Sequence, residues 1–272
     1  MEPARGVGKV SRPDLSAIPR GHPRRASLEE RARLAHGIRT GVTHATGLIA
    51  HGRGEAFDYL LGERTTPEAR RAAGAAAAVL VAAKLPALSV NGNVAAIAPR
   101  AVAQVQRRVS AARGRRGPLR VEANVFHAAP GRIEAIISAL EAAGAKGVLG
   151  RRRDGRIPGM ASHRARCARQ GIFAADVVLV PLEDGDRAQA LRAMGKVVVA
   201  IDLNPLSRTA LAAHITVVDH VGRALPEIAR RARARPDQEA RGPVAIARAF
   251  DNRANLLAAR QRIAKVLGGK AR

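Results

Sequence analysis

Residues 176–209, DVVLVPLEDGDRAQALRAMGKVVVAIDLNPLSRT, decide the expected fold of this chain. The stretch contains two short apolar runs rich in β-branched residues, Val177–Val180 and Val197–Ile201. Each run ends in a group of polar residues that opens a helical pattern. Strand, polar loop and helix repeated in this way predict a parallel sheet, with both loops at the carboxyl edge where open α/β sheets bind ligands.

The two polar groups, residues 183–187 and 202–208, therefore fall where an α/β enzyme binds its nucleotide or metal ion. Helix N-termini at this edge offer unpaired N–H groups to anions. Ordinary capping is the alternative, because Asp and Asn cap helices well and Pro205 suits a first helical position. Capping accounts less well for the pair than for either group alone, because caps seldom need four charges.

The rest of the chain continues this alternation of short strands and helices. Further strands are expected at residues 87–90, 119–125, 147–149 and 215–218. The pattern predicts the α/β fold class, with a parallel sheet covered by helices on both faces. Helical additions are expected at both ends of the chain.

At the N-terminal end, residues 1–25 are rich in Pro, Gly and Arg and are expected to form a flexible arm. Residues 26–272 are expected to form a single domain, beginning with a helix from Ser27. A helix or helix pair is expected after about residue 236, broken near Gly242.

The net charge of +25, with 47 basic residues, raises the possibility of a nucleic-acid-binding protein. Only six of those basic residues are Lys, and Ala is equally over-used, which favours a codon bias. Aromatic residues make up 2% of the chain and Trp is absent, so a base-stacking platform is hard to build. Nucleic acid is therefore not an expected partner. The basic field would instead concentrate phosphorylated and carboxylated small molecules.

The sequence also predicts the compartment. No apolar run reaches the roughly 18 residues needed to span a bilayer. No apolar segment of a secretory signal follows the first basic residues. The single cysteine, Cys167, excludes an internal disulfide and a zinc site built from several cysteines. These features indicate a cytoplasmic protein with no membrane contact.

Several other segments carry residues able to do chemistry. The segment HGRGE looks like a glycine loop opening a helix, in which Arg53 would grip a phosphate. Asn91 and Asn93 follow an expected strand and could bond a hydroxyl or carboxylate, or form an Asx turn. Glu122 and Asn124 alternate along another strand, so one of its faces is expected to be wet or polar.

Other polar segments point to no chemistry of their own. The arginine-rich segments 113–116 and 151–156 are expected to be solvated loops, and Cys167 a packed or exposed free thiol. Histidines without paired spacing favour surface or structural roles over metal binding; they are His127, His163, His214 and His220. The expected site is thus rich in Arg, Asn and Asp but has no obvious nucleophile. That is typical of chemistry in which ATP activates a carboxylate and Mg²⁺ shares the phosphates.

Six segments, in order between about Ile18 and Arg223, resemble the archaeal-type 4-phosphopantoate–β-alanine ligases, also called phosphopantothenate synthetases. Blocks of this length are far more specific than a short glycine motif. They are HPR at 22–24, GLIAHGRGEAFDYL at 47–60, SVNGNVAA at 89–96, IPG at 157–159, and residues 175–187 and 200–208.

The resemblance implies a Rossmann-like core, a homodimer and a role in coenzyme A synthesis. ATP and 4-phosphopantoate would form an acyl-adenylate with release of diphosphate. The amine of β-alanine would then displace AMP to give 4'-phosphopantothenate. The alternatives are a ligase for unphosphorylated pantoate, a kinase on the same fold or, less favoured, a basic nucleic-acid-binding protein.

The resemblance also assigns ATP contacts to individual positions, with Asp202 as a partner of the ribose. They are Arg31, Arg53, Asp202, Leu203, Asn204, Arg208, Thr209, His220 and Val221. We further expect Arg53 to act in catalysis, Asn91 and Asn93 to orient 4-phosphopantoate, and Asp184 and Asp186 to hold Mg²⁺ directly or through water.

The chain departs from the family pattern at three places. His220 stands where Asn is usual, and His127 and Ala128 replace an aromatic residue and an Arg. Around Arg164 the usual His-Glu-Arg order is lost, although basic charge is kept. A phosphate contact at residues 127–128 is therefore in doubt.

Overall fold

The computed structural model describes residues 18–19, 21–126 and 129–269. Most of the expected N-terminal arm, residues 1–17 and 20, lies outside the described residues, as do His127 and Ala128. Within the described ranges, no helix combines the length and the apolar character that crossing a membrane would require.

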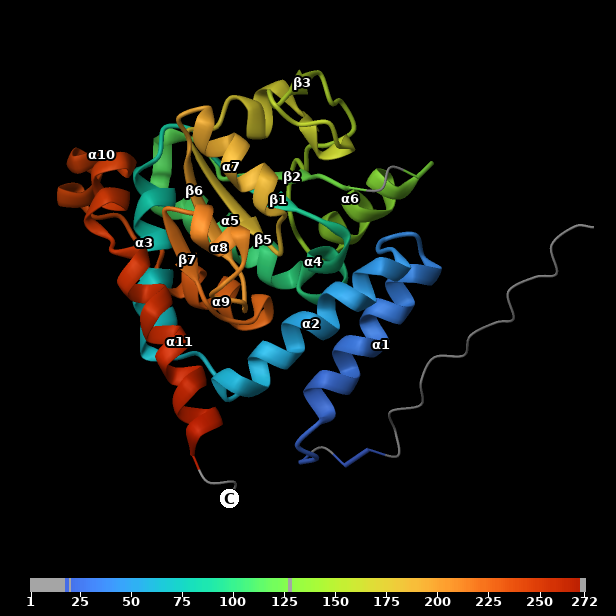
Figure 1. The fold of residues 1–272 in the computed structure, drawn as a ribbon. Helices are drawn as coiled ribbons and strands as arrows, with labels where there is room; N and C mark the ends of the chain where they lie inside the picture. The colour runs from blue at the N-terminus through green and yellow to red at the C-terminus, as the bar shows by residue number, and fades with distance from the viewer. Residues whose placement is uncertain (1–17, 20, 127–128, 270–272) are drawn as a thin grey trace, which may run out of the picture.

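A five-stranded parallel sheet forms the centre of the protein (Figure 1). Its strand order is β2-β1-β5-β6-β7. The strands are β1 (Pro86–Val90), β2 (Arg120–Ala123), β5 (Val177–Pro181), β6 (Val197–Ile201) and β7 (Ile215–Val217). Every residue of β1, β5 and β6 is buried, which explains why these strands are continuous apolar runs.

Helices cover both faces of the sheet, which confirms the predicted fold class. One face packs against α3 (Pro67–Ala82), α5 (Pro99–Arg113) and α9 (Val221–Arg231), largely through small and β-branched side chains. The other face packs against α7 (Gly185–Ala193) and α8 (Arg208–Ala212).

Shorter elements complete the core. Along the chain, α4 (Gly92–Ile97) comes directly after β1, and α6 (Arg132–Ala142) comes after β2. A small antiparallel pair joins β3 (Gly155–Arg156) to β4 (Arg166–Cys167). A π-helix, η3 (Arg169–Phe173), leads from this pair to β5, and 3-10 turns lie at Gly114–Arg116 (η1) and His163–Ala165 (η2).

The helical additions lie outside this core (Figure 1). The helices α1 (Arg25–Arg39) and α2 (Ala45–Leu61) pack together beyond the carboxyl edge of the sheet. The C-terminal α10 (Pro236–Ala249) and α11 (Asn252–Gly268) pack against α3. The predicted break near Gly242 is confirmed, because this residue has a φ of 71° and kinks α10.

The predicted strand at residues 147–149 is wrong in extent. Only an isolated bridge forms there, between Leu149 and Glu122. Gly150 then turns the chain away at a φ of +131°, close against the backbone of Ala123. Pairing therefore cannot continue along β2.

Glu122 decides between the two alternatives of a second expectation. Its face of β2 is polar, as predicted, but it is not wet, because the side chain is fully buried. The carboxylate accepts hydrogen bonds from the backbone N–H groups of Ala168 (2.9 Å) and Ile172 (2.7 Å). Burial raises the pKa of Glu122 above its usual value. This carboxylate fastens the β4–η3 segment to the sheet.

Arg113 corrects a third expectation, since it is buried and is not part of a solvated loop. Its guanidinium donates to carbonyl groups at the end of α3 and beyond, including those of Val81 (3.0 Å) and Lys84 (3.0 Å). It also donates to Gly117 in the turn that precedes β2 (2.9 Å). The last carbonyls of a helix lack intrahelical partners, and a cation there is favourable.

Candidate active site

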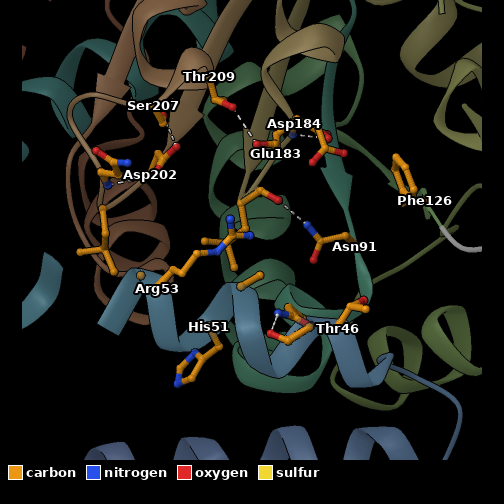
Figure 2. Close-up of a pocket in the computed structure, with 18 of the residues that line it drawn as sticks. Thr46, His51, Arg53, Asn91, Phe126, Glu183, Asp184, Asp202, Ser207 and Thr209 are labelled. Atoms are coloured by element: carbon orange, nitrogen blue, oxygen red, sulfur yellow. Dashed lines mark hydrogen bonds between the residues drawn. The ribbon is translucent and has the colours of Figure 1, made fainter. Parts of the chain in front are cut away.

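A cavity of about 770 Å³ lies at the carboxyl edge of the sheet. The loops that follow β2, β1, β5 and β6 form its base, and α2 lies across it (Figure 2). Ten of the predicted site residues line it: Arg53, Asn91, Asn93, Asp184, Asp202, Leu203, Asn204, Arg208, Thr209 and His220. The predicted residues Arg31, Asp186 and Val221 are not among those that line it.

The expected glycine loop around Arg53 is wrong, because HGRGE lies inside α2. The helix begins earlier, where the imidazole of His44 caps it by accepting from the N–H of Thr46 (3.3 Å). Any side chain at Gly47 would overlap Asn93, so the glycine lets α2 approach the sheet edge closely. Arg53 is exposed on α2 and extends between this helix and the strand ends (Figure 2).

Asn91 and Asn93 are both hydrogen-bonded to protein groups. Asn91 caps α4 through its Oδ1, which accepts from the N–H of Val94 (3.1 Å). Its Nδ2 donates to the carbonyl of Leu182 (2.9 Å), which ties the β1 loop to the β5 loop. The Nδ2 of Asn93 donates to the carbonyl of Gly47 on α2 (2.8 Å). These amides therefore shape the base of the cavity.

A buried cluster of charges follows β5. Glu183 pairs with both Arg164 and Arg187, and Arg187 also donates to the hydroxyl of Ser89 (2.9 Å). Burial, followed by repulsion from Arg187, lowers the pKa of Arg164 to about 10. Because Glu183 is engaged by two cations, it is not free to bind a metal ion.

Asp184 has a different environment from Glu183. Its side chain is 48% exposed and lies 3.4 Å from the Nε of Arg164. Mg²⁺ commonly binds one or two carboxylates together with substrate phosphates, so Asp184 fits such a role. Asp186 is exposed on α7 and does not line the cavity.

The loop after β6 is held by its own side chains. The carboxylate of Asp202 accepts from the N–H of Asn204 (2.9 Å) and from the hydroxyl of Ser207. Ser207 in turn caps α8 by accepting from Ala210 (2.9 Å), so capping explains part of this polar group. Burial raises the pKa of Asp202 above its usual value. Thr209 donates to the carbonyl of Glu183 (2.7 Å) and joins this loop to the β5 loop.

A further polar cluster lies at the rim between α1, α2 and α9. The Oε2 of Glu30 lies 3.2 Å from the Nε2 of His220, and Arg31 pairs with Glu55 at 2.6 Å. Burial acts to raise the pKa of Glu30, but contact with His220 outweighs it and the pKa is lowered. In Figure 2, His51 points away from the strand ends. Burial lowers the pKa of His51.

Three of these rim groups could approach one metal ion. Ligand atoms of Glu30, His51 and His220 lie within 4.8 Å of one another, a grouping found within the described part of the chain. Two imidazoles and one carboxylate suit zinc or a similar transition metal better than Mg²⁺, which prefers oxygen ligands. The Mg²⁺ expected from the sequence is therefore better matched by Asp184 than by this cluster.

Three charged residues near the cavity were not predicted from the sequence as site residues. Glu30 forms its pair with a residue distant in sequence, His220, and Arg164 is buried beside Glu183 of the β5 loop. Arg132 is the first residue of α6 and also lines the cavity. The position of Arg132 after a predicted strand and Gly131 was the one signal that could have revealed it.

The sequence of the chain is similar to that of known proteins. The profile of the phosphopantothenate/pantothenate synthetase family matches residues 68–266. The chain belongs to this family.

Curated relatives cover most of the chain. A protein of Methanosarcina mazei is 44% identical over 242 residues, 89% of this chain and 92% of its own length. One from Methanospirillum hungatei is 50% identical over 216 residues, 78% of this chain and 84% of its own. One from Thermococcus kodakarensis is 44% identical over 236 residues, 86% of this chain and 87% of its own. All three are named 4-phosphopantoate–β-alanine ligase.

Proposed function

We propose that this protein is an ATP-dependent ligase that joins 4-phosphopantoate to β-alanine through an acyl-adenylate. The observation that carries the proposal is the cavity at the carboxyl edge, where Arg53, Asp202 and Arg208 come together from α2 and the β6 loop. Membership of the synthetase family and the names of its relatives support the same reaction.

ATP would lie at the β6 end of the cavity. Asp202 is held by Asn204 and Ser207, so its carboxylate is oriented to accept from a ribose hydroxyl. The guanidinium groups of Arg53 and Arg208 would neutralise the phosphates, since charge-assisted bonds are among the strongest in proteins. The remaining nucleotide contacts implied by the resemblance are at Arg31, Leu203, Asn204, Thr209, His220 and Val221.

The reaction needs no protein nucleophile. A carboxylate oxygen of 4-phosphopantoate attacks the α-phosphorus of ATP, and the bond to the bridging oxygen of the β-phosphate breaks to release diphosphate. The amine of β-alanine then attacks the acyl carbon, loses a proton and expels AMP. Cys167 takes no part, because it is buried away from the cavity and burial raises the pKa of its thiol to about 12.

Positioning and electrostatics would supply the catalysis. Asn91 and Asn93 would orient the acid by fixing the loops at the base of the cavity, because their amides already bond protein groups. Asp184 would hold Mg²⁺ directly or through water. The ion would neutralise charge on the triphosphate. We assign Asp186 only an indirect part, because it lies on the exposed side of α7.

Product analysis tests this proposal. Purified protein is incubated with ATP, Mg²⁺ and β-alanine, together with either pantoate or 4-phosphopantoate, and the products are identified by mass spectrometry. The proposal expects 4'-phosphopantothenate, AMP and diphosphate from 4-phosphopantoate. Formation of ADP would indicate a kinase, and product from pantoate alone would indicate the unphosphorylated acid as substrate.

We also propose a homodimer in the cytoplasm. The support for the dimer is the family resemblance, together with exposed apolar side chains on α11 such as Val266 and Leu267. Light scattering of the purified protein checks the dimer, and a monomer would contradict it.

A further inference from the structure

Arg132 is a buried cation without a counterion. It is 9% exposed, and its Nε is buried with no hydrogen-bond partner. Within residues 18–19, 21–126 and 129–269, its guanidinium forms no ion pair or hydrogen bond. Glu134, an acid in the same helical turn, pairs instead with Arg151 at 2.7 Å. Burial lowers the pKa of Arg132, as expected for an uncompensated charge.

The other buried arginines in the described part of the chain have protein partners, although some nitrogens of Arg164 and Arg187 also lack a hydrogen bond. Arg113 donates to a set of backbone carbonyls, whereas Arg164 and Arg187 share the carboxylate of Glu183. Leaving a buried charge unpaired destabilises a folded protein. An unpaired arginine in the wall of a cavity is therefore suited to bind an anionic ligand.

The surroundings of Arg132 favour an anion. It is the first residue of α6, an 11-residue helix whose N-terminus has no side-chain cap. Free N–H groups at such a terminus point toward a bound anion, and the helix dipole adds to the attraction. The guanidinium can also form two parallel bonds to a phosphoryl group or a carboxylate.

Strand order separates this site from the proposed nucleotide site. Arg132 follows β2, which is an edge strand, and Asp202 follows β6. Two strands lie between β2 and β6, so these strands are three strand spacings apart, about 14 Å. Asn91 follows β1 and Asp184 follows β5, so they occupy the interval.

We infer that Arg132 and the N-terminus of α6 form a second anion site, which binds the phosphoryl group of the acid substrate. This inference rests on the proposed function. The acid carries a phosphoryl group at one end and a carboxylate at the other. With the phosphoryl group at the β2 end, its carboxylate lies over β1 and β5, facing the nucleotide at the β6 end. Arg132 thereby selects the phosphorylated acid over pantoate.

Two substitutions in the full chain test this. Arg132→Met removes the charge and Arg132→Lys keeps it without the paired geometry. We expect KM for 4-phosphopantoate to rise about 10- to 100-fold with Arg132→Met and less with Arg132→Lys. KM for ATP and for β-alanine should change less than about twofold. Arg107→Met, an exposed position on α5, is the matched control and should leave all three values unchanged.

Thermal unfolding separates a binding role from a structural one. Because the charge of Arg132 is uncompensated, Arg132→Met should melt at the same temperature as the unaltered protein or higher. A lower melting temperature, together with a lower kcat and no selective rise in KM for 4-phosphopantoate, would show a structural role and overturn the inference.

The remaining outcomes are distinct. A rise in KM for β-alanine alone would assign Arg132 to the carboxylate of that substrate and overturn the inference. If the unaltered protein ligates no acid at all, the proposed function fails. Calorimetry then decides the anion site separately: binding of 4-phosphopantoate that is lost in Arg132→Met supports it, and equal binding by both proteins overturns it.

Discussion

At the amino edge of the sheet, Arg113, Lys196 and Asp176 are paired with other protein groups, whereas some buried nitrogens at the carboxyl edge are not. Arg113 and Lys196 donate to backbone carbonyls there, and Asp176 accepts from the N–H groups of Lys84 (2.7 Å) and Leu85 (2.8 Å). At the carboxyl edge, buried nitrogens of Arg132 and His51 have no hydrogen-bond partner. Native proteins rarely leave such groups unpaired, so the contrast marks the carboxyl edge as the functional one.

The largest effect that tests this difference between the two edges is a loss of stability on substitution at the amino edge. Arg113→Met leaves several carbonyl groups unpaired, and we expect the free energy of unfolding to fall by about 3 kcal/mol. Chemical denaturation measures the change, with the exposed neighbour Arg115→Met as control. A loss below about 0.5 kcal/mol would remove the distinction between the two edges.

At the carboxyl edge the expected loss is of activity. Arg53→Ala should slow adenylate formation at least about a hundredfold, or about 2.7 kcal/mol, while leaving the fold intact. Exchange of labelled diphosphate into ATP measures this step. Arg70→Ala on α3 is exposed outside the cavity and serves as the control. An unchanged exchange rate would exclude Arg53 from the mechanism.

A smaller effect is expected at Asp202. Asp202→Asn keeps an acceptor for the N–H of Asn204 but removes the charge, and KM for ATP should rise about tenfold. Because the pKa of Asp202 is raised, its carboxylate gains a proton at a higher pH than an ordinary Asp does. KM of the unaltered enzyme for ATP should therefore rise as the pH falls toward that pKa, while the pH dependence of the variant is flatter.

The raised pKa of Asp202 also affects stability, in the direction opposite to its effect on ATP binding. A raised pKa in the folded state means that folding favours the protonated form, so ionised Asp202 destabilises the fold at neutral pH. Asp202→Asn should leave the free energy of unfolding at pH 7 unchanged or slightly higher. A clear loss of stability would place Asp202 with the structural groups of the amino edge.

The smallest effect is expected at the rim. The pKa of Glu30 is lowered, so its contact with His220 stabilises the fold above the pKa of the unfolded state. That contribution is lost as the pH falls through the lowered pKa. Glu30→Gln should reduce the free energy of unfolding by about 0.5 kcal/mol at pH 7 and by nothing below that pKa. Denaturation at a series of pH values measures it, and a difference independent of pH would contradict the assignment.

The sequence predicted the elements that depend on local pattern. The apolar runs Val177–Val180 and Val197–Ile201 fall on β5 and β6 because parallel strands buried on both faces consist of continuous apolar residues. The polar groups after them line the cavity because right-handed crossovers bring strand ends to one edge.

What the sequence did not predict depends on contacts between distant segments. Because glycines usually interrupt helices, the segment around Arg53 predicts a loop, although its glycines lie in a helix that packs against the sheet edge. Whether an arginine is paired is also a tertiary property. Arg113 ends one helix and Arg132 begins another, and neither local sequence says that the fold provides partners for the first side chain and not for the second.

Gly47 determines how wide the cavity can be. A methyl group at this position would overlap the amide of Asn93, and one at Gly92 would overlap the carbonyl of Val42 in the α1–α2 connection. A larger residue at either position would force α1 and α2 outward, away from the strand ends. The distance of Arg53 from the strand ends thus depends on the absence of side chains at Gly47 and Gly92. Substitutions at these two positions would change the width of the cavity without altering any residue of the proposed nucleotide site.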